Sequence, residues 1–246
     1  MKIALPNRLM LLAAAIALTA IPTLQAQSLS FLVDLNTASL NTQDSANAPF
    51  YLDFQLNYGN SANAASTVTL SNFTLTGGSA LGSPVVSGSA SGSLTSTVTL
   101  SANSTHPFNE LYQQFSPNVT DITFQATVLE PGPNVGAPTG FVTGVFDSSL
   151  GAGSPAQLYT TAPDAENLLT LNLNASNTVA NVNTYTSLFS ADGSTTVTGV
   201  TATVAVPEPA TTAALFGCAV VLTAFCVRRY GKQRNPQGRS VLALQS

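Results

Sequence analysis

The sequence predicts an all-β fold: an antiparallel, jelly-roll-like β-sandwich with one short helix, occupying residues 27–205. Three observations lead to this prediction. Runs of five to nine residues alternate apolar and polar side chains, which is the period of a strand with one face in a core. Clusters of Gly, Pro, Asn, Asp and Ser separate these runs and favour turns. Apolar stretches flank the body, and we expect them to be a signal peptide and a transmembrane helix.

Residues 1–26 have the layout of a secretory signal peptide. Lys2 and Arg8 precede an apolar run from Leu9 to Ala20, and we expect cleavage after Ala26. An uncleaved amphipathic start or a buried helix is the alternative, which the order of the charges disfavours. Export follows from the signal peptide. Because both cysteines stand later, in the C-terminal apolar stretch, the exported body has no disulfide bond.

The strand predictions rest on the period-2 alternation of apolar side chains. The clearest run is Phe50 to Tyr58, in which every second residue is large and apolar. From Val68 to Leu75 the alternation changes parity between Leu70 and Phe73, which predicts a β-bulge or a bend in the strand. The other alternating runs are Leu29–Leu35, Leu94–Leu100, Ile122–Val128, Leu169–Leu173 and Val200–Val206.

One stretch of the body has the spacing of a helix. Phe108, Leu111, Tyr112 and Phe115 are spaced i, i+3, i+4 and i+7, and Pro107 stands at the first turn. This spacing predicts a short helix that crosses one end of the sandwich.

The segment from residue 61 to residue 105 is rich in hydroxyl side chains, with 20 Ser and Thr among 45 residues. It has the composition of a flexible, glycosylated stalk. The spacing of its Thr and Val fits the solvent faces of antiparallel strands as well, and we favour strands.

Residues 210–227 are predicted to form a transmembrane helix, because they are eighteen residues long and carry no charge. Arg228 and Arg229 follow directly, and the tail from 228 to 246 contains no acid. The positive-inside rule therefore places this basic tail in the cytoplasm and the body outside. A buried core helix is the alternative, which the cations behind it disfavour.

The residues directly before this helix are Val206, Pro207, Glu208 and Pro209. The order of this motif, an apolar helix and two arginines resembles the sorting signal of PEP-CTERM proteins. The resemblance implies an exported bacterial protein that is recognised by an exosortase, a membrane-embedded cysteine transpeptidase. One departure is the length of the tail: such signals usually end soon after the arginines, whereas residues 230–246 continue here.

The body resembles, more loosely, short PEP-CTERM ectodomains that have no assigned activity. The segments that carry this resemblance are Tyr51–Leu56, Ser71–Phe73, Gly88–Leu94 and Asp192–Val197. None of them is chemically diagnostic, so the resemblance implies a common sandwich and no particular ligand.

The body lacks cationic side chains other than one histidine. No Lys or Arg occurs from residue 9 to residue 227, whereas ten Asp and Glu lie between residues 28 and 206, a formal charge of −10. This excludes a nucleic-acid-binding protein, because phosphate contacts need Lys and Arg. P-loop chemistry, a Schiff-base lysine and an arginine clamp for anionic substrates are excluded for the same reason.

No catalytic site is expected. His106 is the single histidine and has no Gly-x-Ser-x-Gly motif beside it, so we expect it at the surface. A glycosidase needs two facing carboxylates, and the spacing of the acids singles out no pair; Asp164 and Glu166 are expected in a solvated loop. Zinc is not expected, because one His and no cysteine in the body cannot supply its usual ligands.

No cofactor is expected. Among metal ions, calcium is the one that the composition allows most readily. Oxygen ligands are plentiful in loops such as Asp147-Ser148-Ser149 and Asp192-Gly193-Ser194, but no Asp-x-Asp-x-Asp loop is present. An ordered structural calcium is therefore a minor hypothesis without assigned ligands.

We expect a non-enzymatic surface or matrix protein, membrane-anchored or released after processing, with a structural or adhesive role in the envelope or exopolysaccharide. The expected partners are an exosortase-type transpeptidase, the membrane and exopolysaccharide, and no nucleic acid. A glycan-binding sandwich is the alternative, and a hydrolase using two of the acids is a third interpretation. The tyrosines considered for stacking on sugar rings are Tyr51, Tyr58, Tyr112, Tyr159 and Tyr185.

Overall fold

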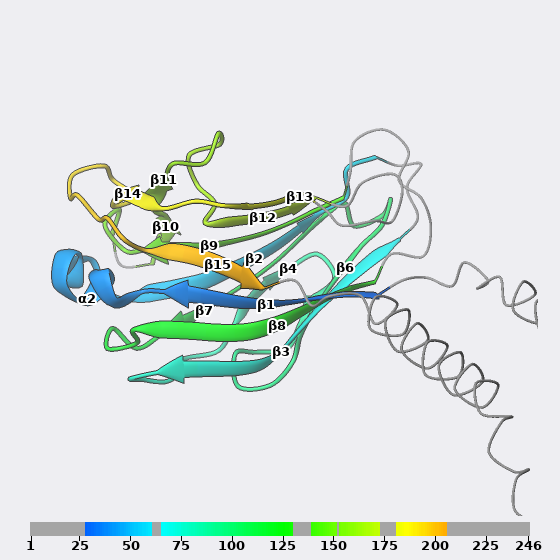
Figure 1. Ribbon diagram of the computed structural model, residues 1–246, viewed down its shortest axis with the longest axis horizontal. Helices are drawn as coiled ribbons and strands as arrows, with labels where there is room; N and C mark the ends of the chain where they lie inside the picture. Colours follow the sequence, from blue (N-terminus) through cyan, green and yellow to red (C-terminus); the bar gives the residue numbers. More distant parts are fainter. Residues whose placement is uncertain (1–27, 61–64, 130–138, 152, 173–180, 206–246) are drawn as a thin grey trace, which may run out of the picture. The chain divides into compact units, whose positions relative to one another are not determined.

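The computed structural model describes residues 28–60, 65–129, 139–151, 153–172 and 181–205 (Figure 1). The predicted signal peptide, the motif 206–209, the apolar stretch 210–227 and the basic tail lie outside these residues. No helix in the described part of the chain is long and apolar enough to cross a membrane.

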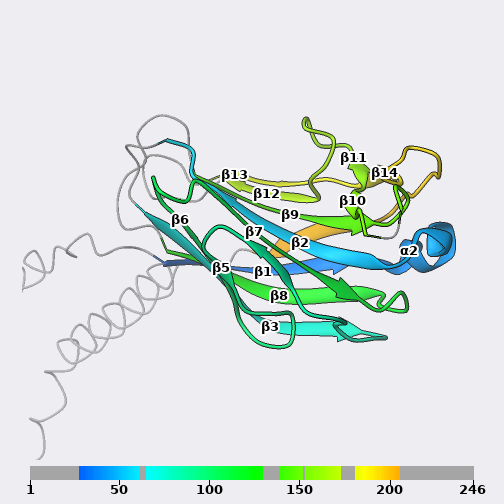
Figure 2. The ribbon, with the colours of Figure 1, turned by 180° about the vertical axis from the view of Figure 1, so that it is seen from behind.

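Two large antiparallel sheets form the framework of the described part of the chain (Figures 1 and 2). The six-stranded sheet has the spatial order β15 (Thr201–Ala205), β1 (Ser28–Asn36), β8 (Asp121–Leu129), β3 (Ser66–Thr76), β6 (Val98–Ala102) and β5 (Ala90–Ser91). The seven-stranded sheet has the order β13 (Asn181–Thr184), β12 (Leu169–Asn172), β9 (Gly140–Asp147), β2 (Phe50–Asn57), β7 (Phe108–Phe115) and β4 (Val85–Ser87), with β10 (Ala156–Gln157) also paired to β9. A small third sheet pairs β11 (Tyr159–Thr160) with β14 (Ser187–Phe189).

One apolar core lies between the two large sheets. On β1, Phe31, Val33 and Leu35 are buried and the residues between them are exposed, so one face of the strand points into the core. Phe54 of β2 meets Phe124 of β8 with ring centroids 5.3 Å apart, which joins the two sheets. The all-β, antiparallel prediction is confirmed, and the described body is held by packing and ladder hydrogen bonds.

The alternating runs predicted as strands are confirmed in β1, β2, β8, β12 and β15, and the run 94–100 in part, since β6 begins at Val98. The predicted bulge is also confirmed: the register of β3 against β8 shifts between Ser71 and Thr74, and Asn72 has a φ of 58°. The described residues of the Ser- and Thr-rich segment include β3, β4, β5 and β6, which confirms strands there.

The helix predicted over residues 108–115 is wrong, because these residues form β7. Leu111 and Phe115 are buried, but Phe108 and Tyr112 point to the opposite face. Asn109 and Gln113 face inward on the same side as Leu111 and Phe115, and they are buried although they are polar. These two inward polar residues hide the period of the strand. The observed helix is α2 (Ala38–Gln43), which lies between β1 and β2 and is followed by the 3₁₀ turn η1 (Ser45–Asn47).

Strand β9, which the sequence analysis missed, lies in the middle of the seven-stranded sheet. Every residue from Phe141 to Asp147 is buried, so the strand shows no alternation of exposed and buried side chains. Because β9 pairs with β2, residues of β9 lie directly beside residues of β2 in the sheet.

Candidate functional site

The outer face of the seven-stranded sheet gathers aromatic and polar side chains from β2 and β7. The large apolar residues of β2 face the core, so Tyr51, Asp53 and Gln55 lie on the opposite face. In the antiparallel pairing of β2 with β7, Asp53 stands opposite Tyr112 and Gln55 stands opposite Glu110. We call these five residues, Tyr51, Asp53, Gln55, Glu110 and Tyr112, the sheet-face cluster.

The two aromatic rings of the sheet-face cluster lie next to a third ring, that of Phe146. The centroids of Tyr51 and Tyr112 are 5.9 Å apart with the rings edge to face, and those of Tyr112 and Phe146 of β9 are 5.3 Å apart. Both tyrosines are partly exposed, whereas Phe146, the partner of Tyr51 across β2 and β9, is buried. Tyrosine rings held in this way offer an apolar surface with a polar edge, which suits stacking against a sugar ring.

Asp53 is the buried acid of the cluster. Its Oδ2 accepts hydrogen bonds from Gln55 Nε2 at 2.8 Å and from Gln157 Nε2 at 2.9 Å, while its buried Oδ1 has no hydrogen-bond partner. Burial, assisted by the neighbouring Glu110, raises the pKa of Asp53 to about 8, although hydrogen bonds from the two amides and the Phe54 backbone act in the opposite direction. Most of the protein therefore carries Asp53 as a neutral acid at pH 7.

Gly144 of β9 lets Gln157 reach Asp53. Asp53 and Gly144 are partners across β2 and β9, and a Cβ at Gly144 would stand 3.1 Å from Gln157 Nε2. A Cβ at this position would require the Gln157 amide to shift by a few tenths of an ångström, so the glycine gives the amide room for its close approach.

The second acid of the cluster, Glu110, is connected to Asp53 through an amide. Gln55 Nε2 lies 3.3 Å from Glu110 Oε1 while it donates to Asp53, and partial burial raises the pKa of Glu110. Acids, amides and tyrosine hydroxyls of this kind exchange hydrogen bonds with hydroxyl groups. Because an amide bridges the two acids, they do not form an open pair on either side of a substrate.

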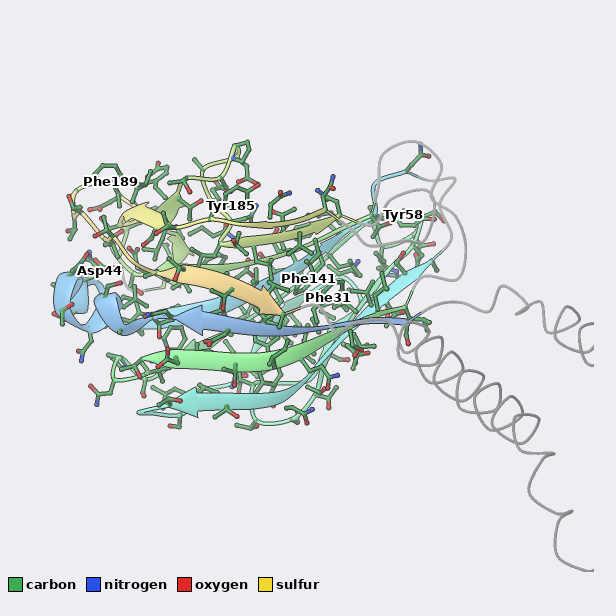
Figure 3. The ribbon with its side chains drawn as sticks, viewed as in Figure 1. Phe31, Asp44, Tyr58, Phe141, Tyr185 and Phe189 are labelled. Atoms are coloured by element: carbon green, nitrogen blue, oxygen red, sulfur yellow. The ribbon has the colours of Figure 1, made fainter. Side chains whose placement is uncertain are left out.

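Of the five tyrosines considered for stacking, the structure brings together Tyr51 and Tyr112. Tyr58 follows β2 and packs against the core (Figure 3), Tyr159 pairs with Phe189 in the two-stranded sheet, and Tyr185 is half-buried before β14. The sequence analysis missed Phe146, Gly144 and Gln157, which reach the cluster from segments about a hundred residues away. No local sequence signal marks them.

No protein-family model, curated protein or solved structure matches the chain. His106 is exposed, and Asp164 and Glu166 lie in a loop, as expected. Within the described residues, no group of three or more His, Cys, Asp or Glu side chains could hold a metal ion. The predicted sorting residues Val206 to Pro209, the arginines 228 and 229, and the cleavage site after Ala26 lie outside the described residues.

Proposed function

We propose that the chain is an exported bacterial surface or extracellular-matrix protein with a structural or adhesive role in the envelope or exopolysaccharide. The observation that carries the proposal is the order of parts in the sequence: a signal-peptide-like start, a body without Lys or Arg, the motif 206–209, an apolar stretch and two arginines. The proposal places the body outside the cytoplasm, with the membrane and an exosortase-type transpeptidase as partners.

The architecture of the body supports this role. The strand order β1-β8-β3-β6 opposite β2-β7-β4, with successive long strands alternating between the sheets, agrees with a jelly-roll-like sandwich. The most buried large side chains form one apolar core, and the exposed acids Asp34, Asp164, Glu166 and Asp192 suit a polar exterior.

Mass spectrometry of both termini of the mature protein, isolated from a native cell that contains an exosortase, tests sorting. We expect the N-terminus at residue 27 and the loss of everything after the Pro-Glu-Pro region. A variant with Pro207, Glu208 and Pro209 all replaced by Ala should persist as an uncut, membrane-retained precursor, because the extended backbone that the prolines impose is lost. Pro163→Ala, in an exposed loop, is the control and should be processed normally. An intact C-terminal tail on all wild-type protein would contradict the proposal.

A glycan-binding module is the second candidate function, and the sheet-face cluster favours it. The cluster combines two partly exposed tyrosine rings with Gln55 and Glu110, which are also partly exposed. Stacking rings beside hydrogen-bonding side chains are the features that a sugar-binding surface uses.

A glycan array and affinity electrophoresis in the native exopolysaccharide test this second candidate. We expect Tyr112→Leu to weaken binding about tenfold or more by removing the stacking ring, and Tyr159→Ala, which removes an exposed ring outside the cluster, to bind as wild type. Equal loss in both variants, or no binding by the wild type, argues against the cluster as a glycan site. Hydrolysis of the bound glycan that disappears in Glu110→Gln would support the third interpretation, an acid-dependent hydrolase.

A further inference from the structure

Two buried carboxyl groups, those of Asp44 and Asp147, lie near each other in the fold, and Figure 3 labels Asp44 beside the helix α2. Asp44 follows α2 and is 1% exposed; Asp147 is the last residue of β9 and is fully buried. The two carboxyl groups lie close enough to interact, since, after burial, the charge of Asp147 is among the causes that raise the pKa of Asp44. Burying two neighbouring acids is unfavourable unless a proton or a cation compensates them.

The hydrogen bonds of these two acids leave one oxygen without a donor. Asp147 Oδ1 accepts from the Ser149 backbone N–H at 3.0 Å and from Ser149 Oγ at 2.7 Å, and Oδ2 accepts from the Ala191 N–H at 2.9 Å. Asp44 Oδ1 accepts from Asn47 Nδ2 at 2.7 Å. Asp44 Oδ2 is buried and has no hydrogen-bond partner. A buried acceptor without a donor, near a second acid, is a place where a bound cation can supply the missing partner.

A third acid increases the negative potential at this place. Asp192 is exposed, its N–H donates to Ser149 Oγ at 2.9 Å, and its charge acts on Asp44. Hydrogen bonds from Ser190 and Ser194 lower the pKa of Asp192 to about 2, so it is anionic at neutral pH. No Lys or Arg occurs from residue 9 to residue 227, so no such side chain of the body can balance these charges.

We propose that Asp44 and Asp147 bind one calcium ion, with Asp192 at the rim of the site. We call these three residues the acid corner. The donors within it are oxygens, which favours calcium over zinc. Since the described residues hold no point where three metal-binding His, Cys, Asp or Glu side chains converge, hydroxyl, carbonyl and water oxygens must complete the shell. Calcium accepts such mixed and irregular shells, whereas magnesium demands a near-octahedral one.

The ion would join three segments that are distant in sequence: the α2–η1 segment, the end of β9 and the loop 190–195. Hydrogen bonds already hold these segments together, because Ser148 N–H donates to the Asn47 carbonyl oxygen and Ala191 N–H donates to Asp147. A cation at the acid corner therefore stabilises the folded state, since the unfolded chain does not bring the ligands together. The site shares no residue with the sheet-face cluster and does not depend on the function proposed above.

A proton shared between the two acids is the competing explanation. Burial, together with the charges of Asp147 and Asp192, raises the pKa of Asp44 to about 7 against the opposing Asn47 hydrogen bond. At pH 8 the proton is mostly gone, and a cation alone can then stabilise the corner. The two explanations therefore differ most at pH 8.

The experiment is thermal unfolding of the purified full-length chain at pH 8, stripped with chelator and then titrated with calcium or magnesium. Weak calcium sites have dissociation constants of ~10⁻⁴–10⁻³ M, so we expect ~10 mM calcium to raise Tm by about 3–10 °C, with a smaller effect of magnesium. Isothermal titration should give one calcium site per chain.

Three variants locate the site. Asp44→Asn should abolish the calcium response and, in chelator, be at least as stable as wild type, because it removes a buried negative charge near a second acid. Asp192→Asn should fold normally and weaken calcium binding several-fold, since it removes only a rim charge. Asp34→Asn, at an exposed position of β1, is the control and should respond as wild type. A wild-type Tm that ignores calcium, or a calcium response that persists in Asp44→Asn, would overturn the proposal.

Discussion

Asp53 shows how single residues manage buried negative charge in a body without Lys or Arg. An acid of this kind usually pairs with a cation. Here two glutamine amides donate to one oxygen, and the acid retains its proton to a pKa of about 8. Its neighbours, Glu110 and Tyr112, add no positive charge. Asp53 is therefore a pH-sensitive residue at the centre of the sheet-face cluster.

The first prediction concerns the stability of Asp53→Asn as a function of pH. Because the pKa of Asp53 is raised from 3.8 to about 8, the folded protein binds this proton more tightly than the unfolded chain does. The stabilising contribution is complete below pH ~4 and is lost as the pH rises to about 8. Asparagine does not titrate. The Tm of the variant should therefore rise relative to the Tm of wild type as the pH increases, and exceed it by roughly 5 °C at pH 8.

Thermal unfolding followed by circular dichroism, in chelator from pH 4 to pH 9, measures this difference. Asp44 titrates near neutral pH in both proteins and cancels in the comparison. Asp34→Asn is the control, because it removes an exposed acid and should follow the wild-type curve. A difference between Asp53→Asn and wild type that does not change with pH would rule out a raised pKa at Asp53.

At the scale of elements, β7 shows how polar residues can face a core. Asn109 Oδ1 accepts a hydrogen bond from the Ser89 N–H, and Gln113 Oε1 accepts one from the Leu94 N–H at 2.8 Å. These side chains hold the 80–95 segment, which crosses from β4 to β5 with few ladder bonds of its own. Two inward positions of β7 are therefore occupied by polar side chains, whose hydrogen bonds fix an irregular segment to the strand.

The second prediction tests one of these anchors. Gln113→Ala leaves the buried Leu94 N–H without its acceptor and the Gly82 carbonyl oxygen without its donor, so we expect a loss of about 2 kcal/mol of unfolding free energy. Gln114→Ala is a matched control, because Gln114 is the next residue of the same strand and points outward; its change should stay within about 0.5 kcal/mol. Urea unfolding measures both values, and equal losses would mean that inward and outward positions of β7 are not distinguished.

The third prediction concerns the bulge of β3. Asn72 has a positive φ of 58°, which Asn and Gly adopt readily and β-branched residues do not. Asn72→Val should therefore destabilise the protein by about 1–2 kcal/mol, whereas Asn72→Gly should be within about 0.5 kcal/mol of wild type. Because Asn72 is exposed, lost packing does not obscure the comparison. Equal unfolding free energies for the two variants in urea would show that the bulge relaxes without cost.

At the scale of the whole molecule, the sequence predicted the parts of the fold that alternate clearly. β2 and β8 each place apolar residues at every second position, so their faces follow from the pattern. β9 is covered on both faces and shows no period, and β7 carries Asn109 and Gln113 toward the core. Prediction failed for these two strands, because in them the alternation of polar and apolar residues does not match the alternation of exposed and buried positions.

The candidate sites depend on pairing that no local pattern contains. Tyr51 and Tyr112 were candidates singly, but the register of β2 against β7 brings them together. The loops at Asp147 and Asp192 were both considered for calcium, and the structure adds Asp44 from a segment that carries no motif. The chemistry of a residue is visible in the sequence, whereas its neighbours across a sheet are set by the fold.

The last prediction concerns the topology of the complete chain, which depends on the distribution of its charges. All seven Lys and Arg lie in the first eight and the last nineteen residues, whereas the body carries a formal charge of −10. Cations resist translocation far more than acids do, so the body should cross the membrane and the tail behind Arg228 and Arg229 should remain inside. A phosphatase that is active only outside the cytoplasm should therefore be active when fused after Ala205 and inactive when fused after Arg239, in a host without an exosortase. Replacing Arg228 and Arg229 with Gln should give the second fusion partial activity, because Lys232, Arg234 and Arg239 stand farther from the membrane interface. If only the fusion after Arg239 were active, the orientation would be the opposite of the predicted one, and export of the body would be refuted.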